Sequence, residues 1–283
     1  IYLDNAAAAP AVPEVQKEMV RAMKLVGNPS SFNDAGREAA EELKKARLVV
    51  ARFLGAHPEE IIFTSSGSEA NNLAILGVAA AYGKKGNSII TTKIEHPSVL
   101  GPVRYLGGKG LGVIYAGNDG EGFVDLEDLK KNISGKTILI SVMYANNEIG
   151  TIEPTRKIGA LIRDFRKKNN SELPLFHVDA CQATGYLNMN VNNLGADLLS
   201  FNGSKIYGPR GIGVLYVRKG LKLEPMIRGG GQERGIRAGT ENLPAIAGLA
   251  KAVSLIKKEE SGKMAKLRDY FIEKISKILP EAK

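Results

Sequence analysis

The sequence of 283 residues contains one cysteine, Cys181, three histidines and no tryptophan. A single thiol excludes an intramolecular disulfide, which agrees with a reducing compartment. No window approaches the roughly eighteen consecutive apolar residues of a membrane span, and residues 1–14 have neither a basic start nor a long apolar run. We therefore expect a cytoplasmic protein that has no membrane partner.

Basic residues outnumber acidic ones, which gives a formal charge of +9. Such an excess is one feature of proteins that bind nucleic acids. Here, however, the lysines are scattered in pairs such as Lys84-Lys85 and Lys167-Lys168, and no aromatic residues are interleaved with them. This pattern is typical of solvated helix faces, so we expect no direct nucleic-acid partner.

Short apolar runs alternate with amphipathic segments along most of the chain. The apolar runs predict strands at 60–64, 88–92, 111–116, 137–144, 173–179, 197–201 and 213–217. The amphipathic segments predict helices at 11–26, 39–55, 68–83, 125–133, 155–168 and 241–259. Several strands are apolar almost throughout, as expected when helices cover both faces of a sheet. The pattern indicates an α/β fold with a largely parallel sheet, in which ligands bind beyond the carboxyl ends of the strands.

The end of the chain differs in character from the rest. From about Lys251 the sequence is purely helical and more charged. We expect a large domain at 1–248 and, at 249–283, the start of a smaller domain that is incomplete. The N-terminal segment of the large domain is expected to pack toward this smaller domain. Because the first residue is Ile rather than Met, we also expect trimmed ends or a fragment.

Three predicted strands are followed by polar residues that have two interpretations each. The segment 65–72, SSGSEANN, leads into a helix whose N-terminus suits a phosphate, although Ser66 or Ser68 would equally serve as an ordinary N-cap. His96 is either a structural hydrogen-bonding residue or a group that stacks on a flat ligand and transfers protons. Asn146 and Asn147 either cap a turn or bind a ligand oxygen.

The next strand ends carry charged groups. Asp179 closes an apolar strand, where a carboxylate is costly to bury without a cation or several donors. Lys205 lies in a short turn, where partial desolvation leaves more of the nucleophilic neutral amine, and a salt bridge is the alternative. The glycine-rich loop 229–240 contains two arginines and ends at Thr240, which is typical of an anion site or a subunit contact.

One ligand matches this combination of groups. Pyridoxal phosphate needs a lysine for its aldehyde, a carboxylate for its ring nitrogen, a flat side chain for its ring, and hydroxyls with a helix N-terminus for its phosphate. We predict that Lys205 forms the Schiff base, Asp179 pairs with the ring nitrogen, and Ser68 with residues 202–204 holds the phosphate. We expect no metal.

The same residues lie in motifs that resemble the cysteine desulfurases of class V aminotransferases. These motifs occur in family order from the first residues to about 250: YLDNAAAAP, GNPSS, GREA, EIIFTSSGSEANNLAI, EHPSVL, NNEIGTI, HVDACQ, SKIYGPRGIGVLYV and GGGQERGIRAGT. The resemblance implies the three-layer α/β/α fold of fold-type I, with a mostly parallel seven-stranded sheet. It also implies a homodimer that takes sulfur from L-cysteine and releases L-alanine. The sulfur then passes as a persulfide to an iron–sulfur scaffold or another sulfur-acceptor protein, or serves tRNA thiolation.

The resemblance also implies individual roles. Lys205 resembles the Schiff-base lysine, His96 the ring-stacking acid/base and Asp179 the pyridinium partner. Asn147 and Gln182 match residues that bind the ring substituents, with Gln182 near the phenolic oxygen. The remaining matches concern the phosphate, which is held by Gly67, Ser68, Asn202, Gly203 and Ser204, and in the neighbouring subunit by Thr240.

The chain departs from the family pattern at several positions. Ser204 stands where the family usually has His, and we expect a weaker hold on the cofactor from this change. Asn33 replaces another common His, and Cys181 a common Thr. The persulfide-forming cysteine and the arginine that binds the substrate carboxylate are expected downstream of residue 283. We expect the chain as given to be incomplete for turnover, with Cys181 as a small packing thiol.

Two alternatives stay open. A selenocysteine lyase or another class V enzyme would share all the residues named above. A non-catalytic subunit that keeps the fold for dimerisation or sulfur relay would explain the missing cysteine, although the intact Lys205, Asp179 and His96 argue against it.

Overall fold

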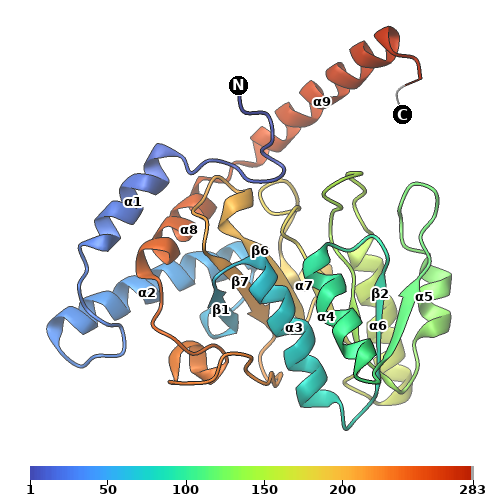
Figure 1. The fold of residues 1–283 in the computed structure, drawn as a ribbon, viewed down its shortest axis with the longest axis horizontal. Coiled ribbons are helices and arrows are strands. Elements are labelled where there is room, and N and C mark those ends of the chain that lie inside the picture. Colours follow the sequence, from blue (N-terminus) through green and yellow to red (C-terminus); the bar gives the residue numbers. More distant parts are fainter. Residues whose placement is uncertain (282–283) are drawn as a thin grey trace.

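A seven-stranded sheet forms the centre of the protein in the computed structural model, which describes residues 1–281 (Figure 1). Its strands are β1 (Ile61–Thr64), β2 (Ser88–Thr92), β3 (Gly112–Ala116), β4 (Thr137–Ser141), β5 (Leu175–Asp179), β6 (Leu198–Asn202) and β7 (Gly213–Val217). They lie in the order β1-β7-β6-β5-β4-β2-β3, and only β7 runs antiparallel to its neighbours. The predicted α/β fold with a mostly parallel seven-stranded sheet is confirmed.

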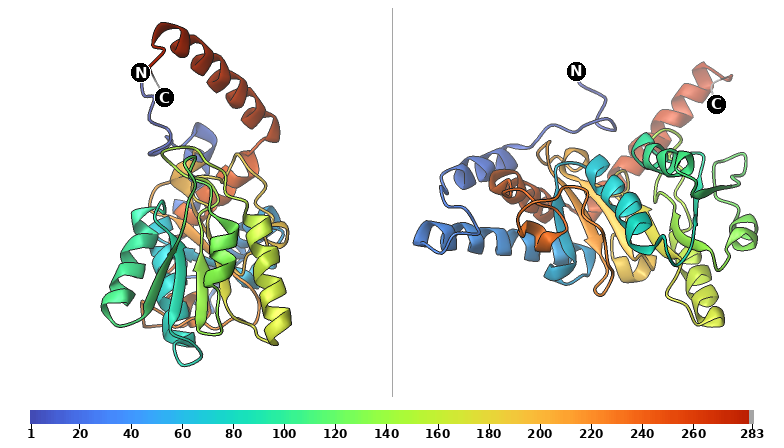
Figure 2. Two further views of the ribbon diagram at one scale, coloured as in Figure 1. Left: turned by 90° about the vertical axis from the view of Figure 1, so that its right-hand side faces the viewer. Right: turned by 60° about the horizontal axis from the view of Figure 1, so that its bottom comes forward.

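Helices cover both faces of this sheet (Figure 2). The helices are α1 (Pro13–Met23), α2 (Asp34–Leu54), α3 (Gly67–Tyr82), α4 (Pro97–Gly108), α5 (Leu126–Asn132), α6 (Thr155–Asn169), α7 (Val191–Leu194), α8 (Leu243–Leu255) and α9 (Lys258–Ile278). Because side chains alternate along a strand, Leu198 of β6 packs with α3 and α4, while Leu199 and Phe201 pack with α2, α6 and α8. Two apolar clusters therefore hold the sheet between two helical layers.

Local sequence explains where the long helices begin and end. The Asn33 side chain accepts a hydrogen bond from the backbone N–H of Gly36 and so caps α2. The same helix ends at Gly55, whose left-handed φ of 64° suits glycine. Ser66 caps α3 by accepting from the N–H of Glu69. Asn33, a departure from the family pattern, thus has a structural role as a cap.

Three differences between the predicted and observed elements stand out, besides the unpredicted short helix α7 and the start of α2 at Asp34. Helix α4 was not predicted, because Pro102 and several glycines disguise its pattern. The expected helix 241–259 is two helices, since the backbone is extended at Ile256 and Lys257. The expected strand 137–144 is shorter, because β4 ends at Ser141, although the N–H groups of Val142 and Tyr144 still donate to the carbonyls of His177 and Asp179 in β5. This last change brings residues 142–147 to the carboxyl edge of the sheet.

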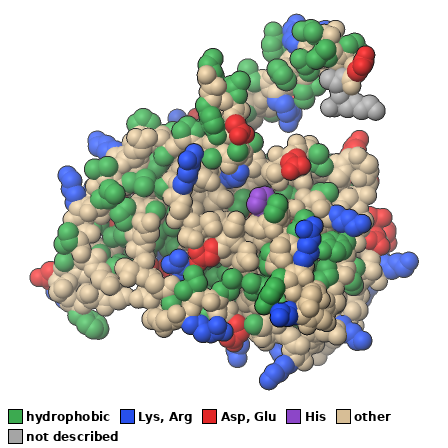
Figure 3. Space-filling view, viewed as in Figure 1, with side chains coloured by type: hydrophobic (Ala, Val, Ile, Leu, Met, Phe, Trp, Pro, Cys, Tyr) green, Lys and Arg blue, Asp and Glu red, His purple; other side chains and the backbone are tan. Residues whose placement is uncertain are grey.

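Helix α9 projects from the body of the molecule, whereas α8 packs against α1 and α2 (Figure 1). Hydrophobic side chains, among them Leu267, Tyr270 and Phe271, are exposed along α9 (Figure 3). Lysine and arginine side chains are scattered over the face shown there. In residues 1–281 no helix is both long and apolar enough to cross a membrane.

Candidate active site

A cavity of about 440 Å³ lies where the carboxyl ends of the parallel strands meet the N-terminus of α3. Its volume falls in the range of small-molecule sites, about 300–1,000 Å³. Apart from Asp4, the polar side chains that line it come from the carboxyl ends of β1, β2, β4, β5 and β6 or from the turns that follow them. The predicted site residues among its lining are Gly67, Ser68, His96, Asn147, Asp179, Gln182, Asn202 and Lys205.

Asp179 is the last residue of β5 and is only 4% exposed. Its Oδ2 accepts from Nδ2 of Asn71 at 2.7 Å, and its Oδ1 accepts from the N–H of Cys181 at 3.0 Å. Both donors are neutral, and within residues 1–281 the carboxylate forms no ion pair. A buried carboxylate on a cavity wall without a cation suits a positively charged ligand group.

Lys205 ends a short 3₁₀ turn, Gly203–Lys205, that follows β6. Its Nζ donates to the carbonyl oxygens of Ala6 at 2.6 Å and Ala7 at 2.8 Å. The alternative of a salt bridge to an acid is therefore not seen. The N-terminal segment that supplies these carbonyls also places Asp4 in the cavity lining. From sequence we predict only that this segment packs toward the smaller domain and no role for it in the site, although its motif YLDNAAAAP is part of the family pattern.

The turn before α3 resolves an ambiguity in the sequence. Because the Ser66 side chain caps the helix, Ser68 is left on the cavity wall. The N–H groups of Gly67 and Ser68 belong to the first turn, where a helix has no internal acceptor for them. A Cβ on Gly67 would lie 2.6 Å from Sγ of Cys181 and 2.9 Å from Nδ2 of Asn202. The glycine thus lets the helix N-terminus approach both side chains closely.

The two asparagines after β4 are placed differently. Asn146 caps a turn, since its Oδ1 accepts from the N–H groups of Glu148 and Ile149. Asn147 instead lines the cavity. Gln182 also lines it, and its buried Oε1 has no hydrogen-bond partner among residues 1–281. An orphaned buried acceptor at this wall fits a ligand that carries a donor.

His96 lies at the N-terminus of α4 and is exposed. Its Nδ1 accepts from the N–H of Ser98 at 3.1 Å and lies 2.7 Å from Oγ of the same serine. The preceding residue, Glu95, is 4% exposed, and burial raises the pKa of its carboxyl well above the usual value. Its Oε1 accepts from the N–H of Met143, which joins the loop after β2 to the loop after β4.

Three predicted residues do not line this cavity. Gly203 and Ser204 lie beside it, and the hydroxyl of Ser204 donates to Oδ1 of Asn202 at 3.0 Å. Thr240 is exposed in a separate hollow that also includes Ser65 and Arg237. Within one chain, Thr240 is therefore not part of the cavity that contains Lys205.

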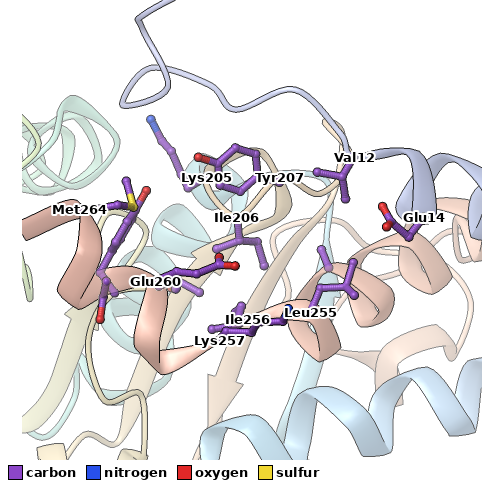
Figure 4. A pocket seen from close by; sticks show the side chains of 15 residues that line it. Val12, Glu14, Lys205, Ile206, Tyr207, Leu255, Ile256, Lys257, Glu260 and Met264 are labelled. Carbon is purple, nitrogen blue, oxygen red and sulfur yellow. The ribbon is translucent and has the colours of Figure 1, made fainter. Parts of the chain in front are cut away.

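A second cavity of about 240 Å³ lies on the other side of Lys205 (Figure 4). It is bounded by Tyr207, by the junction of α8 and α9 at Ile256, and by Glu260 and Met264 of α9. Figure 4 shows the lysine amine directed away from these side chains and toward the N-terminal segment. The reactive end of Lys205 therefore belongs to the larger cavity.

Comparison with known proteins agrees with this geometry. The family model for aminotransferase class-V matches residues 1–283. Cysteine desulfurase IscS from Dictyoglomus turgidum is 47% identical over 281 residues, which cover 98% of this chain and 70% of that protein. Cysteine desulfurase IscS from Methanosarcina thermophila is 45% identical over 286 residues, or 98% of this chain and 68% of that protein.

Solved structures give the same result. A NifS-like protein has a TM-score of 0.92 at 40% identity, covering 98% of this chain and 76% of that one. The structure of SspA in complex with cysteine has a TM-score of 0.87 at 36% identity, covering 96% of this chain and 77% of that one. The chain therefore belongs to the class V aminotransferase family, within its cysteine desulfurase branch.

Proposed function

We propose that this chain is the cofactor-binding part of a pyridoxal-phosphate-dependent cysteine desulfurase that takes sulfur from L-cysteine for iron–sulfur cluster assembly. Its relatives carry that name, and one similar structure was solved with cysteine. The observation that carries the proposal is that the Lys205 amine and the buried Asp179 carboxylate line one cavity of suitable volume. An amine and a carboxylate in one site are what the aldehyde and the ring nitrogen require.

The residues present fit the cofactor. Asp179 lacks a cation and would pair with the ring nitrogen, and the orphaned Oε1 of Gln182 would meet a ring substituent, as would Asn147. The phosphate would bind the free N–H groups of the α3 N-terminus and Nδ2 of Asn202, because anions are favoured there. Ser204 would act indirectly, by fixing the Asn202 amide.

When bound, pyridoxal phosphate supplies an electron sink for the carbanion left when the α-carbon of the substrate loses its proton. Nζ of Lys205 removes this α-proton once it has left the carbonyls of Ala6 and Ala7. The carboxylate of Asp179 keeps a proton on the ring nitrogen. His96, exposed at the edge of the cavity, moves protons between substrate and solvent.

Cys181 does not accept the sulfur in this proposal. Burial and the neighbouring Asp179 carboxylate raise the pKa of its thiol well above the usual value, so the nucleophilic thiolate is disfavoured.

We propose that the protein is cytoplasmic and acts as a homodimer, in which Thr240 reaches the phosphate of the neighbouring subunit. We also propose that residues 249–283 begin the smaller domain and that an iron–sulfur scaffold or another sulfur-acceptor protein takes the sulfur.

The test is to purify the chain with added pyridoxal phosphate and record its visible absorption. We expect the band of a lysine-linked cofactor, and we expect Lys205→Ala to lose it while Lys93→Ala, a change at an exposed lysine after β2, keeps it. A wild-type protein without the band would refute cofactor binding. A band that persists in Lys205→Ala would refute the lysine assignment. Alanine release from L-cysteine compared with L-selenocysteine then separates a desulfurase from a selenocysteine lyase.

A further inference from the structure

A buried asparagine connects two groups on different walls of the cavity. Asn71 lies on α3 and is fully buried. Its Nδ2 carries two hydrogens, one of which is donated to Oδ2 of Asp179 at 2.7 Å and the other to Oγ of Ser98 at 2.8 Å. One amide group thus bridges the end of β5 and the first turn of α4.

The orientation of this amide follows from its partners. An ionised carboxylate only accepts hydrogen bonds, so the side of Asn71 that faces Asp179 must be the NH₂ group. The carbonyl Oδ1 is consequently turned away, and it is buried without a partner among residues 1–281. A buried unpaired acceptor is costly, which indicates that the two donated hydrogen bonds determine how the side chain is placed.

The same reasoning extends from Ser98 to the imidazole. Because Oγ of Ser98 accepts from Asn71, its own proton is available for Nδ1 of His96, which lies 2.7 Å away. The backbone N–H of Ser98 donates to this nitrogen as well, at 3.1 Å. Two donors directed at Nδ1 leave no room for a proton on it, so the neutral ring carries its hydrogen on Nε2.

We propose that Asn71 and Ser98 are positioning residues that hold His96 as the Nε2–H tautomer and link its orientation to that of Asp179. The inference rests on the proposed function, in which His96 and Asp179 act on one bound cofactor. Its consequence is that neutral His96 offers a hydrogen-bond donor, the Nε2–H group, while its Nδ1 is occupied as an acceptor. Helix α3 makes the link possible, because Asn71 lies one turn after Gly67 and Ser68 on the same helix face.

The experiment is nitrogen-15 NMR of histidine side chains in the cofactor-free 283-residue chain at mildly alkaline pH. The protein has three histidines, so the signals of His96 must be separated from those of the other two. His57→Gln removes the signals of His57, and the fully buried His177 serves as an internal control. We expect His96 in the Nε2–H form. Ser98→Ala should shift the ratio of its tautomers by about two- to tenfold toward Nδ1–H, the factor expected from one net hydrogen bond. Ser98→Thr, which keeps a hydroxyl, should restore the wild-type ratio.

Asn71→Ala tests the longer link, since Asn71 does not touch the imidazole. We expect a shift in the same direction as in Ser98→Ala, and no further shift when the two changes are combined. Asn72→Ala is the matched control, because that amide donates to the carbonyls of Ser68 and Ser98 and not to Asp179. It should leave the ratio unchanged.

Several results would overturn the proposal. A wild-type His96 with its proton on Nδ1 would refute the tautomer, and an unchanged ratio in Ser98→Ala would refute the role of the hydroxyl. An unchanged ratio in a folded Asn71→Ala protein would refute the link. If Asn71→Ala does not fold, the Ser98→Ala and Ser98→Thr pair decides alone. The tautomer is measured without cofactor, so its result does not depend on whether the chain binds pyridoxal phosphate. A failure of the proposed function and a failure of this inference can therefore be told apart.

Discussion

A buried ion pair between Glu233 and Arg47 helps to fasten the glycine-rich loop that contains Thr240 to the body of the protein. The side chains of Glu233 and Arg47 are 1% and 12% exposed, and two hydrogen bonds of 2.6 and 2.8 Å join them. The Glu233 carboxylate also accepts from the N–H of Phe63 at 2.9 Å. Glu233→Ala removes the acceptor of three donors and leaves a guanidinium group buried without its counter-ion.

We expect Glu233→Ala to lower the free energy of unfolding by about 3–5 kcal/mol, the usual effect of removing one partner of a buried ion pair. Alanine is the appropriate replacement, because Glu233 has a φ of 45° and glycine would relieve backbone strain at the same time. Urea denaturation at fixed protein concentration, followed by circular dichroism, measures the change.

Two further variants make this measurement specific. Glu273→Ala breaks the exposed pair with Lys277, whose side chains are 58% and 65% exposed, and should cost less than about 1 kcal/mol. The double variant Arg47→Met/Glu233→Leu leaves no unpaired charge and should be less destabilised than Glu233→Ala. A loss in Glu233→Ala no larger than that in Glu273→Ala would refute the reasoning.

Three other changes test burial, close packing and capping. Burial raises the pKa of Glu153 to about 7, so the folded protein holds a proton that the unfolded chain has lost, and stability should fall as pH rises from about 4.5 to about 7. Glu153→Gln should flatten that part of a urea-midpoint profile against pH, and an unchanged slope would contradict the assignment. Gly67→Ala should cost about 1–3 kcal/mol in denaturation, and Cys181→Ala should recover part of this loss by removing one of the two contacts. Asn33→Ala should cost about 1 kcal/mol through loss of the α2 cap, whereas Asn33→Asp, which keeps an acceptor, should not.

The strands could be predicted because each is a short apolar run whose signal is local. Their order could not, since nothing in the run 213–217 says that β7 inserts antiparallel between β1 and β6. Helix α4 escaped prediction for the opposite reason. Its local signal is poor, with Pro102 inside it, and packing of Val99 and Val103 against the sheet stabilises it.

Only the site residues that directly follow a strand could be predicted from the sequence. Asp179 and Lys205 each follow an apolar run, and parallel strands bring such ends to one edge of a sheet. The hydrogen bonds from Asn71 to Asp179 and Ser98 depend on how α3 packs against α4, which no spacing in the sequence specifies. The hydrogen bonds to the carbonyls of Ala6 and Ala7 could not be predicted either, because every residue type has the same backbone carbonyl.

The contact between Lys205 and the carbonyl of Ala6 also bears on how the protein is made. These residues are 199 positions apart, so the first turn of the chain leaves the ribosome long before its partner exists. The cavity that contains Lys205 consequently closes only after the turn beyond β6 has emerged. A nascent chain that stops short of that turn contains the residues of β1 to β6 but lacks the lysine that completes the cavity.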